Sequence, residues 1–161
     1  MKTRLFLLSA LVALATSGCG QKDASASAAA AGPAGPRTIE ITAGDSMKYS
    51  VTAIEASPGE DLKVILTNNG TQPAEVMGHN WVLLKAGTDV AAFDAAGLTS
   101  KETGYIPAAL SGEILAKIDL LGPRKSGEVE FKAPITPGDY TFLCTFPAHY
   151  QTGMKGVLTV K

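Results

Sequence analysis

The sequence predicts an all-β domain, a sandwich of two sheets with Greek-key connections. From Arg37 onward, apolar and polar residues alternate with a period of two, which is typical of half-buried strands. Turn-forming residues such as Gly, Pro, Asn and Asp interrupt this alternation at short intervals. The strands that we expect are Arg37–Ala43, Lys48–Glu55, Asp61–Asn68, Trp81–Leu84, Gly127–Lys132, Tyr140–Cys144 and Gly156–Val160.

Residues 86–118 depart from the strand pattern. The run from Thr88 to Gly97 predicts a short helix with Thr88 or Asp89 as its N-cap, and the stretch from Gly104 to Ser111 predicts irregular structure. We expect a short helical flap inserted on the outside of the sandwich. Such a flap could cover a sheet or contact a partner, and the sequence allows both.

The N-terminal residues predict export. Residues 1–18 have a basic start at Lys2 and Arg4 and an apolar run from Leu5 to Ala15, as in a signal peptide. The run is shorter than the about 20 residues that span a bilayer. The motif ending at Cys19 resembles a lipobox, which predicts cleavage before Cys19 and an exported, periplasmic protein anchored to the membrane by a lipidated Cys19. Ordinary cleavage after Ala15 is the alternative.

Residues 19–36 predict a disordered linker, and residues 37–161 the folded domain. The linker is rich in Ala, Ser, Gly and Pro and cannot bury enough apolar surface to fold, although a short helix at Ala24–Ala31 is an alternative. The whole chain has 14 basic and 15 acidic residues, so its charge is nearly balanced. This balance argues against a nucleic-acid partner.

Three potential metal ligands follow one another near the C-terminus, at Cys144, His149 and Met154. The only other histidine is His79. Two histidines, one cysteine and one methionine are the donor set of a blue-copper site, with the methionine as a weak axial ligand. A disulfide between Cys19 and Cys144 is the alternative use of the two cysteines, and it would consume the thiolate that copper needs.

The runs VMGHNWVL at 76–83, CTFP at 144–147 and MKG at 154–156 resemble azurins and auracyanins, small blue-copper proteins of the cupredoxin family. The resemblance extends from the first strand to Lys161. It implies a cupredoxin-like sandwich with one type 1 copper per chain, bound by Nδ1 of His79 and His149, the Cys144 thiolate and the Met154 sulfur. It also implies that the Gly78 carbonyl is a distant fifth contact. Asn80 should then hydrogen-bond near Thr145 and the Cys144 sulfur.

The resemblance further implies a one-electron carrier that exchanges electrons with other redox proteins. An apolar patch near His149 would form the docking surface. Its expected members are Val76, Met77, Phe146, Pro147, Ala148 and Tyr150.

Three features differ from azurin. The His149–Met154 spacing is one residue longer and matches that of auracyanins. No cysteine lies between Gly20 and Leu143, so the azurin disulfide is absent, and Asn68 stands where azurins commonly have a second histidine. We therefore expect no pH-linked switch at this position.

Two other functions fit the sequence less well. A copper-delivery protein favours exposed, methionine-rich sites, whereas this chain has four methionines in all. A copper enzyme would need a second copper and more than the two histidines present, so we expect no enzymatic activity. Electron transfer remains the leading hypothesis.

Overall fold

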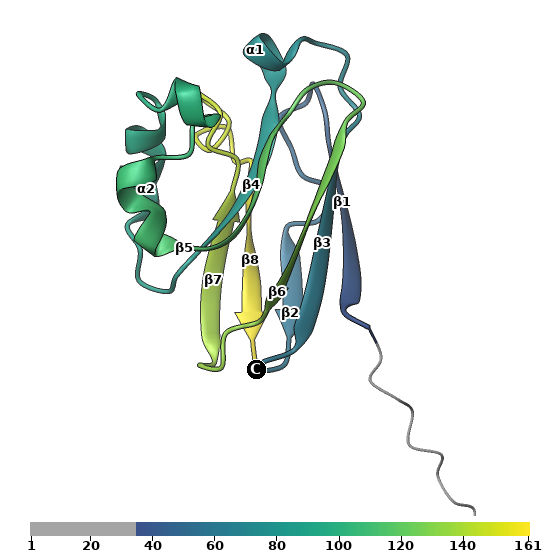
Figure 1. Cartoon of the computed structure of the whole chain (residues 1–161), viewed down its shortest axis with the longest axis vertical. Helices are drawn as coiled ribbons and strands as arrows, with labels where there is room; N and C mark the ends of the chain where they lie inside the picture. Colours follow the sequence, from purple (N-terminus) through teal and green to yellow (C-terminus); the bar gives the residue numbers. More distant parts are fainter. Residues whose placement is uncertain (1–34) are drawn as a thin grey trace, which may run out of the picture. The chain divides into compact units, whose positions relative to one another are not determined.

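The computed structural model describes residues 35–161, which form two β-sheets (Figure 1). The predicted signal peptide, Cys19 and nearly all of the predicted linker lie outside the described residues. One sheet contains the strands β1 (Arg37–Ala43), β3 (Asp61–Asn68) and β6 (Ser126–Lys132). The other contains β2 (Ala53–Ala56), β4 (His79–Leu84), β5 (Ile114–Leu121), β7 (Gly138–Leu143) and β8 (Lys155–Val160).

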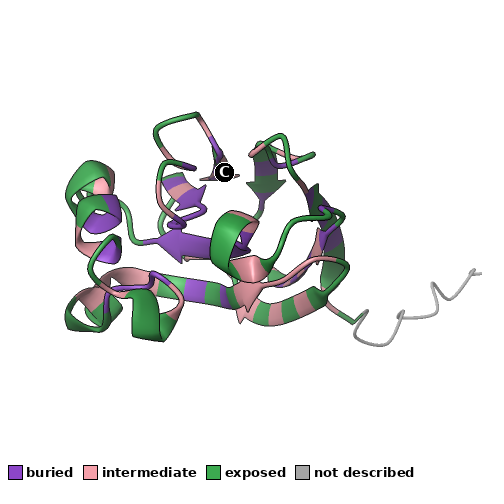
Figure 2. Cartoon of the chain, turned by 90° about the horizontal axis from the view of Figure 1, so that it is seen from above, coloured by how far each residue is buried: buried purple, intermediate pink, exposed green. Residues whose placement is uncertain are grey.

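The strand orders are β1-β3-β6 in one sheet and β2-β8-β7-β4-β5 in the other. The alternation in sequence becomes alternation in burial: in β3, Leu62, Val64 and Leu66 are fully buried while their neighbours face outward (Figure 2). Trp81 and Phe142 from the second sheet complete the core, with ring centroids 5.4 Å apart. Each such side chain contributes about 1.5–3 kcal/mol through burial. The predicted sandwich is confirmed.

The two ends of the sandwich are distinct. Arg37 is in register with Leu62 and Ala43 with Asn68, while Asn68 donates through its side-chain amide to the Leu121 carbonyl at 3.0 Å. Leu121 in turn pairs with His79. The beginning of β1 is therefore at the end opposite His79. Lys161 lies at the same end as Arg37, because both contact Glu55.

The predicted flap is shorter than expected. Ile114–Leu121, assigned mostly to the flap, is the strand β5, which runs antiparallel to β4 with Trp81 opposite Ile118. The flap thus ends at residue 113 and contains α2 (Val90–Gly97) and two 3-10 turns, Lys101–Thr103 and Ala108–Glu113. Asp89 is the N-cap of α2, because its side chain accepts a hydrogen bond from the Ala92 N–H at 3.0 Å. Of the two predicted N-caps, Thr88 and Asp89, the second is confirmed.

The flap covers the outer face of β4 and β7 (Figure 1). Phe93 of α2 is fully buried against Val82, Leu84 and Leu143 in a second, smaller core. Of the two roles expected for the flap, covering a sheet is confirmed.

Several strand boundaries differ from the predictions. The end of β2 and the starts of β6 and β8 differ by one residue, and β7 begins two residues early, at Gly138. β2 begins at Ala53 and not at Lys48, because the chain turns near Met47 (φ 53°) and buries Tyr49, whose hydroxyl donates to the Asn80 carbonyl at 2.5 Å. β4 begins two residues earlier than expected, at His79, and β7 ends at Leu143, one residue before Cys144.

One short helical turn, α1 (Ala74–Met77), precedes β4 at the end of the sandwich that carries His79 (Figure 1). Within residues 35–161, no helix has the length and apolar character needed to cross a lipid bilayer.

Candidate metal centre

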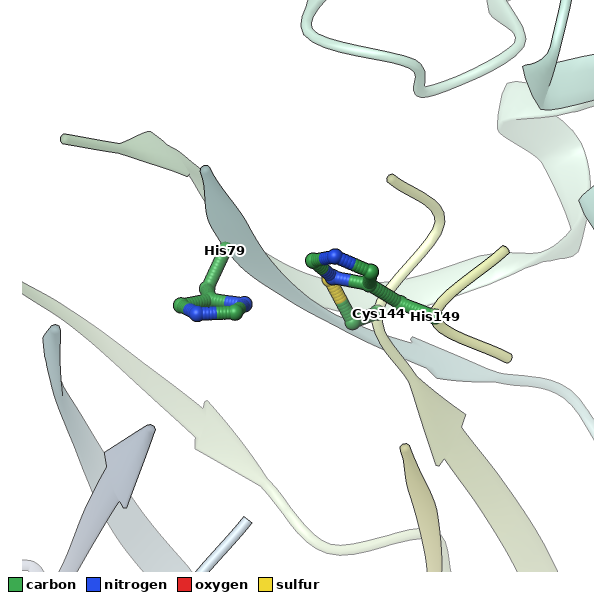
Figure 3. A group of neighbouring side chains, drawn as sticks. All are labelled: His79, Cys144 and His149. Carbon is green, nitrogen blue, oxygen red and sulfur yellow. The ribbon is translucent and has the colours of Figure 1, made fainter. Parts of the chain in front are cut away.

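The fold brings His79, Cys144 and His149 together. His79 is the first residue of β4, and Cys144 directly follows β7. These strands pair antiparallel, with Val82 opposite Leu143, so the beginning of one lies near the end of the other. The ligand atoms of the three side chains all lie within 4.8 Å of one another, and all three residues are buried (Figure 3).

The loop after Cys144 closes on itself. The Cys144 Sγ is 3.4 Å from Nδ1 of His149. The backbone N–H of Met154 donates to the His149 carbonyl at 2.9 Å, and the N–H of Cys144 donates to the Met154 carbonyl at 3.1 Å. Met154 is therefore fully buried beside Cys144. The predicted axial role of its sulfur remains a prediction.

His79 has the environment of a metal ligand. Its side chain is fully buried, and neither ring nitrogen has a hydrogen-bond partner among the described residues. Leaving a buried polar atom unpaired costs about 1–3 kcal/mol. A metal that takes the lone pair of one nitrogen would satisfy that nitrogen. The His149 ring lies beside it, with centroids 4.9 Å apart (Figure 3).

Burial sets the protonation of the three ligands. It lowers the pKa of His149 to about 4. It also lowers the pKa of His79, opposed in part by the Gly44 backbone and by Asp45, neither of which forms a hydrogen bond with the ring. Both imidazoles are therefore neutral at pH 7 and have free lone pairs.

The Cys144 thiol behaves differently. Burial raises its pKa to about 12, although the peptide N–H groups of Asn80 and Phe146 act in the opposite direction. A cation must therefore replace the thiol proton. Cys144 forms no disulfide with any residue between 35 and 161. One thiolate and two imidazoles in a buried site suit copper.

Asn80 connects the two parts of the chain that carry the ligands. Its side-chain amide donates to Oγ1 of Thr145 at 2.8 Å and to the Gly104 carbonyl at 3.0 Å, and its Oδ1 accepts the Thr145 N–H at 2.9 Å. The predicted contact with Thr145 is confirmed. The contact with Gly104, which belongs to the flap, was not expected.

Gly78 must be glycine for steric reasons. A Cβ at this position would lie 2.6 Å from the Ala74 carbonyl oxygen and 2.9 Å from the Leu120 side chain. Because Gly78 has no side chain, the backbone can pass close to Ala74 and Leu120 as it turns from α1 into β4, which begins at His79. The role of the Gly78 carbonyl as a fifth contact remains a prediction.

The surface around the ligand loop is partly apolar. Val76 is 57% exposed, Ala148 is exposed, and Met77, Pro147 and Tyr150 are half-buried.

Phe146 departs from the expected patch. Its side chain lies in the core, because its ring packs between those of Tyr105 and His149. The ring centroids are 5.0 Å apart for Tyr105 and 4.7 Å apart for His149. His149 itself is 1% exposed.

Two residues near the site were missed from the sequence. Lys48 donates to the Thr152 carbonyl of the ligand loop. Asp94 of α2 is buried and accepts a hydrogen bond from Gln151 of the same loop. A signal for Asp94 did exist: it is four residues after Val90 and three before Gly97, which places all three on one face of the helix.

Known proteins share this architecture. Residues 37–161 match the model of a family described as copper binding proteins, plastocyanin/azurin family. Azurin from Bordetella pertussis is 36% identical over 124 residues, which cover 75% of this chain and 81% of that protein. Auracyanin-B from Chloroflexus aurantiacus is 33% identical over 126 residues, 77% of this chain. The match covers only 52% of auracyanin-B, so the chain spans about half the length of that relative.

The structural comparison agrees. The crystal structure of dithionite-reduced auracyanin from Roseiflexus castenholzii superposes with a TM-score of 0.69 and 38% identity, covering 80% of this chain and 99% of that one. The ligand geometry, the sandwich and the match over residues 37–161 lead to one conclusion: the chain belongs to the plastocyanin/azurin family of copper-binding proteins, the cupredoxins.

Proposed function

We propose that the protein is a one-electron carrier with a single type 1 copper centre, and not an enzyme. The observation that carries this proposal is the convergence of three buried ligand atoms within 4.8 Å, one of them on an imidazole without hydrogen-bond partners among residues 35–161. His79, Cys144 and His149 would hold the copper, with the Met154 sulfur and the Gly78 carbonyl as further, weaker contacts. The copper supplies a Cu(I)/Cu(II) couple when it is bound.

The protein's own residues keep the site from changing shape. Asn80 joins the beginning of β4 to the ligand loop, and the backbone hydrogen bonds between Cys144, Met154 and His149 close that loop. Ligands fixed in this way need not move when the charge of the metal changes, which lowers the barrier to electron transfer. Burial also keeps water from the ligands.

The test of the copper site is direct. Addition of Cu(II) to the metal-free, reduced protein should give an intense blue thiolate-to-copper absorption and the paramagnetic spectrum of a type 1 site. The Cys144→Ser variant should give neither. A colourless wild-type protein in the presence of Cu(II) would refute the assignment.

Copper exchange separates a carrier from a delivery protein. Because the ligands are buried and the loop is closed, we expect copper to transfer slowly to an acceptor apo-protein. Rapid transfer would favour delivery.

The docking surface for redox partners is proposed to be the apolar area formed by Val76, Met77, Pro147, Ala148 and Tyr150. Pro147, Ala148 and Tyr150 belong to the loop that carries His149, and Val76 and Met77 lie in α1 just before His79. All five are exposed or half-buried. Small interfaces of this kind serve transient redox encounters. The Met77→Lys variant should slow electron exchange with redox proteins and leave the copper spectrum unchanged. Loss of colour would instead mean that Met77 supports the site.

Location is a further part of the proposal. The basic start, the short apolar run and the lipobox-like motif at Cys19 support export to the periplasm and a lipid anchor. Labelling of cells with a radioactive fatty acid should mark the wild-type protein and not the Cys19→Ala variant. Equal release of both proteins in soluble form would contradict the anchor.

A further inference from the structure

Asp94 is an ionisable residue buried against the ligand loop. It lies in α2 and is 1% exposed. Its Oδ2 accepts a hydrogen bond from Nε2 of Gln151, and its Oδ1 has no partner among residues 35–161. Burial of a carboxyl group is costly unless hydrogen bonds compensate for it. The contact with Gln151 is its only side-chain compensation within this part of the chain.

Gln151 belongs to the ligand loop, two residues after His149 and three before Met154. The backbone around it is a compact turn. The Thr152 N–H donates to the Ala148 carbonyl at 3.0 Å, the Thr152 hydroxyl donates to the His149 carbonyl at 2.8 Å, and the Gly153 N–H donates to the Tyr150 carbonyl at 2.9 Å. A force on the Gln151 side chain is therefore transmitted to this whole half of the loop.

The other end of the contact is rigid as well. Phe93, next to Asp94, is packed against Val82 and Leu143 of the strands that lead to the ligands. At the end of α2, a Cβ on Gly97 would lie 3.5 Å from Cβ of Thr145 and 2.7 Å from the Tyr105 carbonyl oxygen, so the helix is in close contact with the residue after Cys144. Asp94 is thus fixed relative to Cys144.

We propose that Asp94 is a positioning residue for the copper centre. Through its hydrogen bond with Gln151 it ties the His149–Met154 half of the ligand loop to the flap, and so fixes two ligands relative to Cys144. The proposal rests on the proposed function and adds a role for the flap. The bond is of the strong, charge-assisted type when the carboxylate is ionised.

The test compares three variants of the full chain. Asp94→Ala removes the contact, and Asp94→Asn keeps an oxygen that can accept from Gln151. Asp89→Ala is the matched control, because it removes the N-cap of the same helix without touching the loop. The measurements are the rate of copper release to a chelator, the hyperfine splitting in the Cu(II) paramagnetic spectrum, the reduction potential, and amide hydrogen exchange of residues 150–154 in the metal-free protein.

Asp94→Ala should release copper about tenfold faster, since a hydrogen bond to a charged group contributes at least this factor. It should also change the hyperfine splitting and the potential, and speed hydrogen exchange in the loop. Asp94→Asn keeps a neutral hydrogen bond, so it should lie between Asp94→Ala and the wild type. Asp89→Ala should leave the copper spectrum unchanged.

Gln151→Leu provides the second route if Asp94→Ala fails to fold. Gln151 is exposed, so this change removes the same bond without leaving a cavity in the core. It should reproduce the effects expected of Asp94→Ala.

The proposal is overturned if variants without the bond match the wild type, if Asp94→Asn is as impaired as Asp94→Ala, or if Asp89→Ala changes the spectrum equally. Failure of the wild-type protein to form a blue centre would refute the proposed function instead. Hydrogen exchange in the metal-free loop would still decide the role of Asp94.

Discussion

The replacement Asn80→Ala gives the sharpest test of how the site is held. It removes three hydrogen bonds of a fully buried side chain: two donated to Gly104 and Thr145 and one accepted from the Thr145 N–H. Each bond contributes about 0.5–1.5 kcal/mol, and partners left buried and unpaired add to the loss. We expect the free energy of unfolding of the metal-free protein to fall by about 3–4 kcal/mol.

Urea unfolding followed by fluorescence measures this change. An unchanged slope of free energy against urea would show that the loss belongs to the native state. Thr145→Val is the matched control: it removes only the hydroxyl partner and should cost about 1 kcal/mol. Because the hydroxyl has no such bond once Asn80 is absent, the double variant should lose about 1 kcal/mol less than the sum. A loss below about 1 kcal/mol for Asn80→Ala, with strict additivity, would refute the reasoning.

Three further predictions concern the ligand loop. Ala148 has φ 72°, a left-handed conformation that glycine adopts without strain, so Ala148→Gly should raise the free energy of unfolding by up to about 1 kcal/mol, measured by urea unfolding. The pKa of His149 is lowered from 6.5 to about 4, so the unfolded state binds a proton that the folded state excludes. The metal-free protein should therefore lose up to about 3 kcal/mol of stability as the pH falls from about 6.5 to 4 in thermal or urea unfolding, and a flat profile would contradict this. Because burial raises the pKa of the Cys144 thiol to about 12, Cu(II) binding at pH 8 should release about one proton per copper, measured by calorimetry in buffers of different ionisation enthalpy.

The strands were predictable where one face of a sheet is buried. Arg37–Ala43 and Asp61–Asn68 have the predicted bounds, because apolar side chains at every second position can only be buried by a strand. Ile114–Leu121 has similar alternation but follows a run of turns, so most of it is predicted as part of the flap. The predicted strand start at Lys48 is wrong for another reason. Tyr49 packs in the core and donates a hydrogen bond to the distant Asn80 carbonyl, and contacts of this kind leave no local signal in the sequence.

The ligands of the candidate site were predictable from the sequence, but the residues that hold the ligand loop in place were not. The spacing of Cys144, His149 and Met154 indicated copper, and the structure brings His79 to the first two of them. Which residues hold the loop depends on how distant segments pack. Asp94 shows this most clearly. Its place on one helix face with Val90 and Gly97 is visible in the sequence, but its contact with Gln151 of the loop is not.

The direction in which β1 runs determines which end of the domain stays accessible when the chain is attached to a support. The chain enters the sandwich at Arg37 and leaves it at Lys161, both at the pole far from His79 (Figure 1). A lipid, a fused domain or an electrode attached through either of these two residues therefore leaves the opposite end, which carries His79, facing away from the support. Immobilisation through Arg37 should leave electron exchange with dissolved proteins unhindered, whereas attachment through α1 should block it.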